Sequence, residues 1–327
     1  MPLTRREAIA GCGGGLAWLA VLPARAQAAY PNRTIKMIVP YPAGGTTDLL
    51  GRMITDQLKS GLDATVIVEN KPGAGTTLGA DLVAKSAPDG YTLLMATSTT
   101  LAINKTLYKK LRYDPVKDFT PIALVAGVPF ALIVNPQVPA KTLSAFIAYA
   151  KSKPGLTYGS AGNGSPQHLG AEMLKAVAGI NIRHVPYRSS VSAMLDVIAG
   201  HLAFMMVDLQ PALKPIREGK VRCLGVTRLT RVAAAPEIPT LAEAGLPGFE
   251  LVAWQGVVGP AGLRRDIADQ LAVQIGKLLA DPATRDKLTT LALEPPPGSS
   301  PDSFAAYVKN EVDRWAVIVK RSGIELE

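Results

Sequence analysis

The sequence predicts an α/β protein of two lobes, each a mainly parallel sheet flanked by helices. Short β-branched apolar runs alternate with helically spaced apolar residues along the chain, a pattern typical of parallel strands joined by helices. The length of 327 residues suggests about two domains. Irregular stretches near Gly127 and Gly225 look like crossings between the lobes. With 48% hydrophobic and 19% charged residues, the chain can bury a core.

An export signal is expected at the start of the chain, over residues 1–26. Arg5 and Arg6 precede an apolar stretch at 8–22, which is shorter than a membrane-spanning helix requires. Residues 24–26 or 26–28 form a small-x-small cleavage pattern. The paired arginines also suit the twin-arginine export route. We therefore expect a periplasmic protein.

The mature chain is expected to open with strand–helix units that build the first lobe. Their β-branched or helical spacing predicts strands at 35–39, 65–69 and 91–96 and helices at 48–58 and 78–87. The chain is predicted to end in an amphipathic helix at 302–321, with Ser300 or Asp302 as its N-cap.

The lobe boundaries follow from the two crossings. Two strand-like runs, 122–126 and 130–134, are separated by Gly127, where we expect the chain to leave the first lobe. Strands at 202–207 and 221–226 then belong to the second lobe, and the chain returns after Gly225. The expected domains are lobe 1 at 27–127 and 227–327, and lobe 2 at 128–226, with a ligand cleft between them.

Three glycine-rich loops, at 40–48, 70–77 and 158–165, each follow a strand and precede a helix. In a parallel sheet such loops lie at the carboxyl ends of the strands, where ligands bind. Glycine allows a close approach of the backbone, and the helix N-terminus offers free N–H groups and a partial positive charge. Three such ends facing one cleft predict an anion site. The alternative is that each loop is a tight turn capped by Thr or Ser.

Rival functions have weaker support. The glycines at 73, 75 and 79 depart from the dinucleotide-binding spacing, and no acidic residue follows at the expected distance. Ser165 and His168 lie within one helical turn, but a capping Ser165 explains them better than a hydrolase pair. The three histidines have no metal-ligand spacing. We therefore expect no enzyme, no cofactor and no metal.

Neither the net charge nor the remaining cysteine indicates a special function. The net charge of +9 comes from dispersed basic residues, so we expect no nucleic-acid partner, although a mild positive field attracts small anions. Cys223, the sole cysteine left after removal of the signal, is expected to be an inert thiol in a buried strand.

At its loops the chain resembles the Bug family of periplasmic receptors, the solute-binding components of tripartite tricarboxylate transporters. The matching segments are 39–48, 69–75, 88–93, 158–165 with His168 and Leu169, 185–187, and 239–245. The resemblance implies a two-lobed flytrap fold (type II) that closes on a small carboxylate. It also implies delivery to the membrane subunits of such a transporter, and we expect a monomer.

The resemblance also implies which residues touch the ligand. Asp208 matches an acidic position of the family and suits a ligand amine or hydroxyl, or a bound water; it could instead cap a helix. Thr97 and Ser98 end the third strand and are expected to face the cleft as well. The other implied contacts are Tyr41, Ala43, Gly44, Thr46, Asp48, Ala74 and Gly75 in lobe 1, and Ser160, Asn163, Ser165 and His168 in lobe 2.

One loop departs from the family pattern. After 185–187 the family shows a basic residue, a glycine and a later proline, whereas this chain has Arg188 followed by serines. Arg188 could bind a distal carboxylate through two hydrogen bonds or lie in solvent. The identity of the carboxylate therefore stays open. The alternatives from other classes are an exported hydrolase and a ligand-sensing adaptor for a membrane signalling protein.

Overall fold

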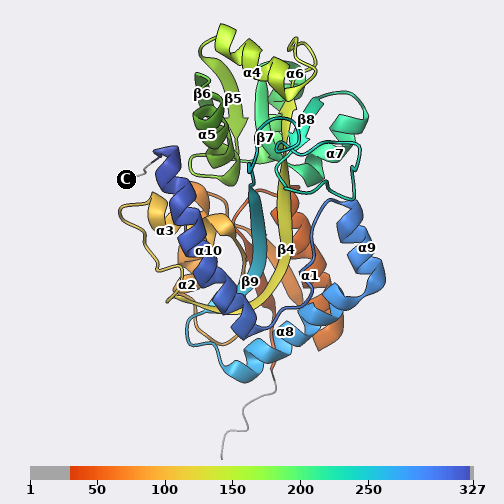
Figure 1. Cartoon of the computed structure of the whole chain (residues 1–327). Coiled ribbons are helices and arrows are strands. Elements are labelled where there is room, and N and C mark those ends of the chain that lie inside the picture. The colour runs from red at the N-terminus through yellow and green to blue at the C-terminus, as the bar shows by residue number, and fades with distance from the viewer. Residues whose placement is uncertain (1–29, 325–327) are drawn as a thin grey trace, which may run out of the picture.

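The computed structural model describes residues 30–324 and consists of two lobes joined by long strands (Figure 1). Strand β4 (Phe119–Val134) runs through both lobes, and β9 (Val252–Pro260) lies antiparallel beside its first half. The two strands expected at 122–126 and 130–134 are therefore one. Gly127 does not break β4, because it stays opposite Trp254 in the ladder. The expected signal at 1–26 lies outside the described residues.

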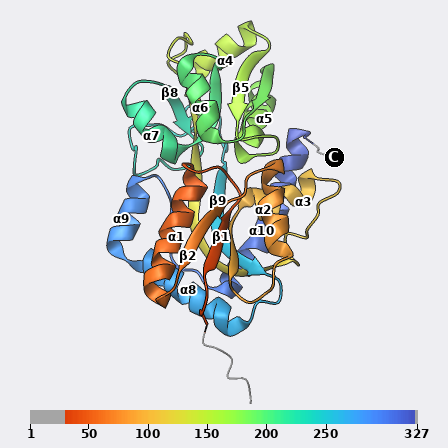
Figure 2. The same ribbon diagram turned by 180° about the vertical axis from the view of Figure 1, so that it is seen from behind.

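The first lobe contains the sheet β2-β1-β3-β9-β4. Strands β1 (Ile35–Val39), β2 (Val66–Asn70) and β3 (Thr92–Thr97) are parallel, and β9 pairs antiparallel with β3 and β4. The helices of this lobe cover both faces of the sheet. Helices α8 and α10 lie in front of the sheet in Figure 1, and α1 and α2 lie in front of it in Figure 2. The helices of the first lobe are α1 (Thr46–Leu62), α2 (Thr77–Ala84), α3 (Asn104–Leu107), α8 (Arg265–Ala280), α9 (Pro282–Thr290) and α10 (Pro301–Ser322).

The second lobe repeats this plan with the far half of β4. Strands β5 (Leu156–Ser160), β6 (Ile182–Pro186) and β7 (Phe204–Asp208) follow β4 in the order β7-β5-β6, and β8 (Arg222–Val226) pairs with β4 separately. The pairs β5–β6 and β5–β7 are parallel, whereas β7 and β8 are antiparallel to β4. The helices of this lobe are α4 (Leu143–Ser152), α5 (Pro166–Ala178), α6 (Ser190–Ala199) and α7 (Leu209–Arg217). The predicted two-lobed α/β fold is confirmed.

Each lobe has its own apolar core. In the first lobe, Trp254 packs edge-to-face on Phe304 at 5.7 Å between ring centroids, and Trp315 is fully buried. Phe304 and Trp315 lie on α10, which forms the amphipathic helix expected at 302–321, and its capping box at Ser300 is present. In the second lobe, Phe146 and Tyr158 both pack on Phe204. Burial of such side chains contributes about 1.5–3 kcal/mol each.

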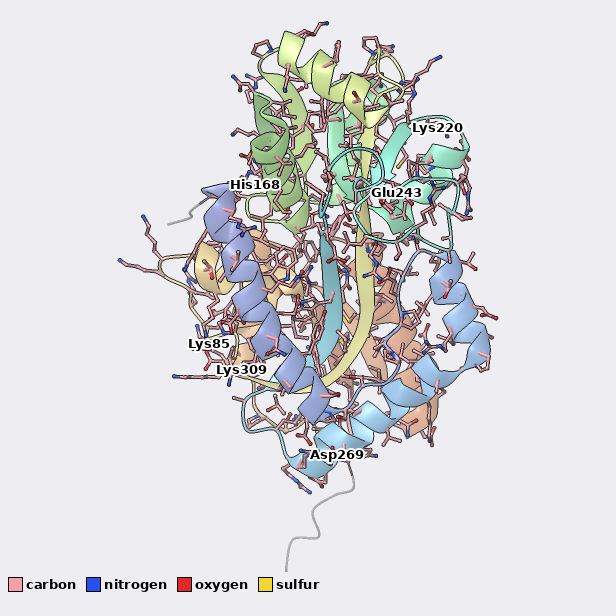
Figure 3. All side chains as sticks on the ribbon, viewed as in Figure 1. Lys85, His168, Lys220, Glu243, Asp269 and Lys309 are labelled. Carbon is pink, nitrogen blue, oxygen red and sulfur yellow. The ribbon has the colours of Figure 1, made fainter. Side chains whose placement is uncertain are left out.

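The segment between β8 and β9 packs on the second lobe. Leu241, Leu246 and Phe249 share a core cluster with Phe146 and Tyr158, and Figure 3 labels Glu243 beside that lobe. The chain then returns to the first lobe through β9. We therefore propose that the second lobe extends to about residue 251, beyond the expected boundary at 226.

Candidate functional site

A cavity of about 50 Å³ lies between the lobes, against the crossing strands β4 and β9. We call it the strand-side cavity. Its first-lobe wall comes from the start of α1 and the end of β3, and its second-lobe wall from the starts of α5 and α6 and the end of β7. The residues of its lining with polar side chains are Tyr41, Thr46, Thr47, Thr97, Ser98, Thr99, Gln167, Ser189, Ser190, Asp208, Trp254 and Gln255.

A larger cavity of about 420 Å³ adjoins it and is formed by the glycine-rich loops. This loop-side cavity is lined by residues 72–76 of the first lobe and by 161–163, Ser165, Tyr187 and Arg188 of the second. Tyr41, Thr99 and Ala161 line both cavities. The two cavities therefore adjoin, and the loop-side cavity has a size typical of a small-molecule site.

Several helices begin at the strand-side cavity. The first residues of α1, α5 and α6 line it, and Asp208 directly precedes α7. The N-caps of α5 and α6, Ser165 and Ser189, accept hydrogen bonds from their own helices, whereas Gly45 leaves α1 without a side-chain cap. The start of α1 therefore offers free N–H groups and partial positive charge to an anion. No Lys or Arg is among the lining residues of this cavity.

Asp208 connects the two lobes inside this cavity. It is only 9% exposed and accepts hydrogen bonds from Thr46 Oγ1 at 2.9 Å and from Gln167 Nε2 at 2.6 Å. Burial raises the pKa of its carboxyl, although both hydrogen bonds act in the opposite direction. The ion pairs found among residues 30–324 include none with Asp208.

Three other buried oxygens of this cavity have no hydrogen-bond partner within the described part of the chain. They are Ser98 Oγ, Gln167 Oε1 and Gln255 Oε1. The amide nitrogen of Gln255 contacts Thr47 Oγ1 at 3.1 Å. Sequence reasoning named Ser98 but missed Gln167 and Gln255. Gln255 is a polar residue in the apolar strand β9, and a buried polar side chain is itself an informative signal.

The second glycine-rich loop has an unusual backbone. Residues Gly73, Ala74, Gly75 and Thr76 have φ values of 137°, 45°, 58° and 75°. For Ala74 and Thr76 this conformation costs about 1–2 kcal/mol each. The first lobe fixes the loop, because Asn104 Nδ2 donates to Gly75 O at 2.9 Å and Tyr108 OH donates to Ala74 O at 3.1 Å. Ala74 and Gly75 line the loop-side cavity.

The first glycine-rich loop has a different arrangement from the one expected. Ala43, Gly44 and Asp48 line neither cavity. Asp48 accepts hydrogen bonds from Gly44 N at 3.0 Å and from Arg52 Nε at 2.9 Å, within the first lobe. Burial opposes ionisation of Asp48, but hydrogen bonds from Arg52, Asn70 and Gly44 outweigh it and lower the pKa. In this structure Asp48 positions the loop around the start of α1.

Ser160 and His168 also line neither cavity. Figure 3 labels His168 at the end of the second lobe that faces the first. His168 stacks on His184 at 3.7 Å between ring centroids and accepts a hydrogen bond from Gly164 N, while Ser165 caps the helix. Burial lowers the pKa of His168 to about 3 and that of His184 to about 4. Both imidazoles are therefore neutral near pH 7.

Ser160 and His184 form a serine–histidine contact that the sequence did not suggest. Ser160 Oγ lies 2.6 Å from His184 Nε2. The same oxygen is also within 3.0 Å of the carbonyl oxygen and the amide nitrogen of Gly162, and Ser160 is fully buried. Among the hydrogen bonds of residues 30–324, none joins a carboxylate to His184. This contact therefore fixes the loop at 160–164 from within the second lobe.

The other residues expected to contact the ligand line one or both cavities. Tyr41, Thr46, Thr97, Ser98 and Asp208 line the strand-side cavity, and Tyr41, Ala74, Gly75, Asn163, Ser165 and Arg188 the loop-side cavity. Arg188 is exposed. Burial raises the pKa of the Cys223 thiol to about 12, which suits an unreactive cysteine. Within residues 30–324 no group of three or more His, Cys, Asp or Glu residues could hold a metal ion.

The chain is similar in sequence to known proteins. Residues 50–324 match the model of the tripartite tricarboxylate transporter family receptor. The chain is 34% identical over 329 residues to the protein BugT of Bordetella pertussis, covering 100% of both chains. It is 36% identical over 293 residues to a UPF0065 protein from the tcbD-tcbE intergenic region of Pseudomonas sp. strain P51, covering 89% of this chain and 87% of the relative.

Solved structures agree with the sequence relatives. Rpa4515 of R. palustris, solved with adipate, has a TM-score of 0.88 and 33% identity, with 91% of this chain and 99% of that chain covered. MatC of Rhodopseudomonas palustris, solved with malate, has a TM-score of 0.84 and 34% identity, with 89% and 100% covered. The periplasmic binding protein BugD has a TM-score of 0.86 and 34% identity, with 91% and 100% covered. None of the helices described here is long and apolar enough to cross a membrane.

Proposed function

Because this chain belongs to the tripartite tricarboxylate transporter family of receptors, whose members are periplasmic solute-binding proteins, we propose that it captures a small carboxylate between its lobes. We further propose that it hands the carboxylate to the membrane subunits of such a transporter and does not alter it chemically. The expected signal at 1–26 would bring it to the periplasm.

The uncapped N-terminus of α1 in the strand-side cavity carries this proposal. Helix ends hold anions through backbone N–H groups and their partial positive charge. The cavity offers no lysine or arginine for the same purpose. Relatives of similar fold were solved with adipate and with malate, both small carboxylates.

Closure of the lobes would complete the site. Thr46 of the first lobe and Asp208 of the second are joined by a hydrogen bond in this structure. Leu107 of the first lobe packs against Gly164 of the second so closely that a Cβ at residue 164 would overlap it. A ligand that contacts both walls favours the closed arrangement by its extra contacts there.

A thermal-shift screen of the chain from Gln27 onward, against mono-, di- and tricarboxylates, tests the proposal. A carboxylate at 100 times its Kd adds about 2.7 kcal/mol to the free energy of unfolding, a shift of a few degrees. Gly45→Leu, whose side chain would enter the strand-side cavity, should abolish the shift. Gly276→Leu is the control, because the space around both glycines is open. No shift with any carboxylate would refute the receptor function, and turnover of a compound would favour the hydrolase.

Uptake measurements separate transport from signalling. Cells that lack this receptor should lose uptake of the identified carboxylate and regain it with the wild-type chain but not with Gly45→Leu. Unchanged uptake together with a changed transcriptional response would favour the sensing adaptor.

A further inference from the structure

We propose that the strand-side cavity binds an ammonium group, so that the ligand of this receptor is an amino-substituted carboxylate. This inference rests on the proposed function and names the ligand class of the same site. Three buried acceptor groups of this cavity carry it: the carboxylate of Asp208, Gln167 Oε1 and Gln255 Oε1. The hydroxyl of Ser98, which can both donate and accept, lines the same cavity without a partner among the described residues.

Asp208 presents a buried carboxylate that no cation in the described part of the chain balances. Its two hydrogen-bond donors, Thr46 and Gln167, are neutral groups. An isolated buried charge is costly unless it is paired. The N-terminus of α7, which follows Asp208, supplies part of the compensation, and a ligand cation would supply the rest.

The side-chain amide of Gln167 has its orientation fixed by Asp208. Its Nε2 lies 2.6 Å from Asp208 Oδ1, and a carboxylate accepts hydrogen bonds from N–H groups. Gln167 Oε1 is therefore an acceptor, and it has no donor partner within residues 30–324. Gln167 is 5% exposed, so this oxygen needs a donor inside the cavity.

Gln255 adds an acceptor from the first lobe, and Ser98 adds a hydroxyl that can accept. Gln255 is 5% exposed and Ser98 is fully buried, and both line the same cavity. Gln255 donates its amide N–H toward Thr47 Oγ1, which leaves Gln255 Oε1 without a partner among the described residues. An ammonium carries three N–H donors and a positive charge. It therefore matches this set in both hydrogen-bonding capacity and charge, whereas a hydroxyl supplies one donor and no charge.

The sizes of the cavities suit a ligand whose ammonium and adjacent carboxylate enter the strand-side cavity while the rest of the molecule lies in the loop-side cavity. The strand-side cavity, at about 50 Å³, admits a small group. The loop-side cavity, at about 420 Å³, admits the rest of the molecule and is bordered by Arg188. A carboxylate at the start of α1 and an ammonium beside Asp208 would satisfy opposite charges within one site.

Binding of matched ligand series by calorimetry tests this inference. At each chain length from three to six carbons, the unsubstituted acid, the 2-hydroxy acid and the 2-amino acid are compared, as mono- and dicarboxylates. We expect the amino compound to bind at least tenfold more tightly than its hydroxy analogue and at least a hundredfold more tightly than the unsubstituted acid. Asp208→Asn should reduce the preference for the amino compound at least tenfold, and the exposed Asp286→Asn should leave it unchanged.

The calorimetry distinguishes failure of the ammonium site from failure of the receptor function. If carboxylates bind but the amino group brings no advantage, the ammonium site is refuted and the receptor function stands. If no carboxylate of any kind binds, the receptor function itself fails. If the preference survives in Asp208→Asn, the ammonium lies elsewhere. Gln167→Met, which keeps the side-chain volume, gives the same test should Asp208→Asn fail to fold, as judged by circular dichroism.

Discussion

Gly164→Ala is expected to weaken ligand binding by opposing closure. Gly164 lies in the second lobe with φ +72°, and a Cβ there would stand 1.9 Å from Leu107 Cδ2 in the first lobe. The left-handed backbone costs a non-glycine residue about 1–2 kcal/mol, whether the lobes are open or closed. The overlap costs about 1–3 kcal/mol more, as in an overpacked core, and only when the lobes meet. Because ligand binds the closed form, Kd should rise about 5- to 150-fold.

Gly179→Ala is the matched control for this prediction. Gly164 lies just before helix α5, and Gly179 lies directly after it. Gly179 also has a positive φ, +62°, but the space around its Cβ position is empty. Its substitution should lower the free energy of unfolding by a similar backbone cost but leave Kd unchanged. Kd can be followed by the fluorescence of Trp254, which lines the strand-side cavity. Equal Kd values for Gly164→Ala and Gly179→Ala would show that a side chain at residue 164 does not oppose closure of the lobes.

Three further predictions concern stability. Burial raises the pKa of Asp208, so the ionised carboxyl destabilises the folded state increasingly as pH rises above the pKa of the unfolded chain; Asp208→Asn should therefore raise the melting temperature of the ligand-free protein at pH 7, and a lower melting temperature would contradict this. The pKa of His168 is lowered to about 3, so this residue alone should lower the free energy of unfolding by about 1.4 kcal/mol per pH unit between pH 6.5 and about 3, and urea titrations should find a shallower slope in His168→Asn. Glu311 accepts hydrogen bonds from the indoles of Trp254 and Trp315, so Glu311→Ala should cost roughly 2–4 kcal/mol and Glu311→Gln less, in the same titrations.

The strands and the loops between strands and helices could be predicted because their signals are local. The run at Ile35–Val39 is apolar and β-branched, and it forms β1 as expected. Since parallel strands place their carboxyl ends at one edge, the loop at 40–48 and the end of the third strand could be assigned to the cleft. The resemblance to the Bug family then singled out Tyr41 and Thr46 within that loop, and both line the strand-side cavity together with Ser98.

Side-chain direction and long-range contacts could not be predicted in this way. Ser160 follows the same loop logic, yet its hydroxyl contacts His184, a residue from the neighbouring strand β6. Gln167 meets Asp208 only because α5 and β7 pack together, 41 positions apart. Gly127 suggested an interruption, but Glu294 pairs with it through backbone hydrogen bonds in both directions, so the chain stays extended there. Such contacts depend on the assembled lobes.

The crossing strands explain why the outer loops should respond most to closure. Before residue 130, β4 pairs with β9, and from residue 130 it pairs with β7 and, from 131, with β8. The buried Thr227 ties this change of partner together, because its hydroxyl contacts the backbone of Phe130 and of Leu251. We expect a rotation about this point to move the β4 and β9 residues that line the strand-side cavity less than the loop at Gly164, which contacts the first lobe. The β4 and β9 residues of the cavity can therefore contact a ligand group in the open form. The contacts of the loops, which form only when the lobes meet, determine by how much the ligand prefers the closed form.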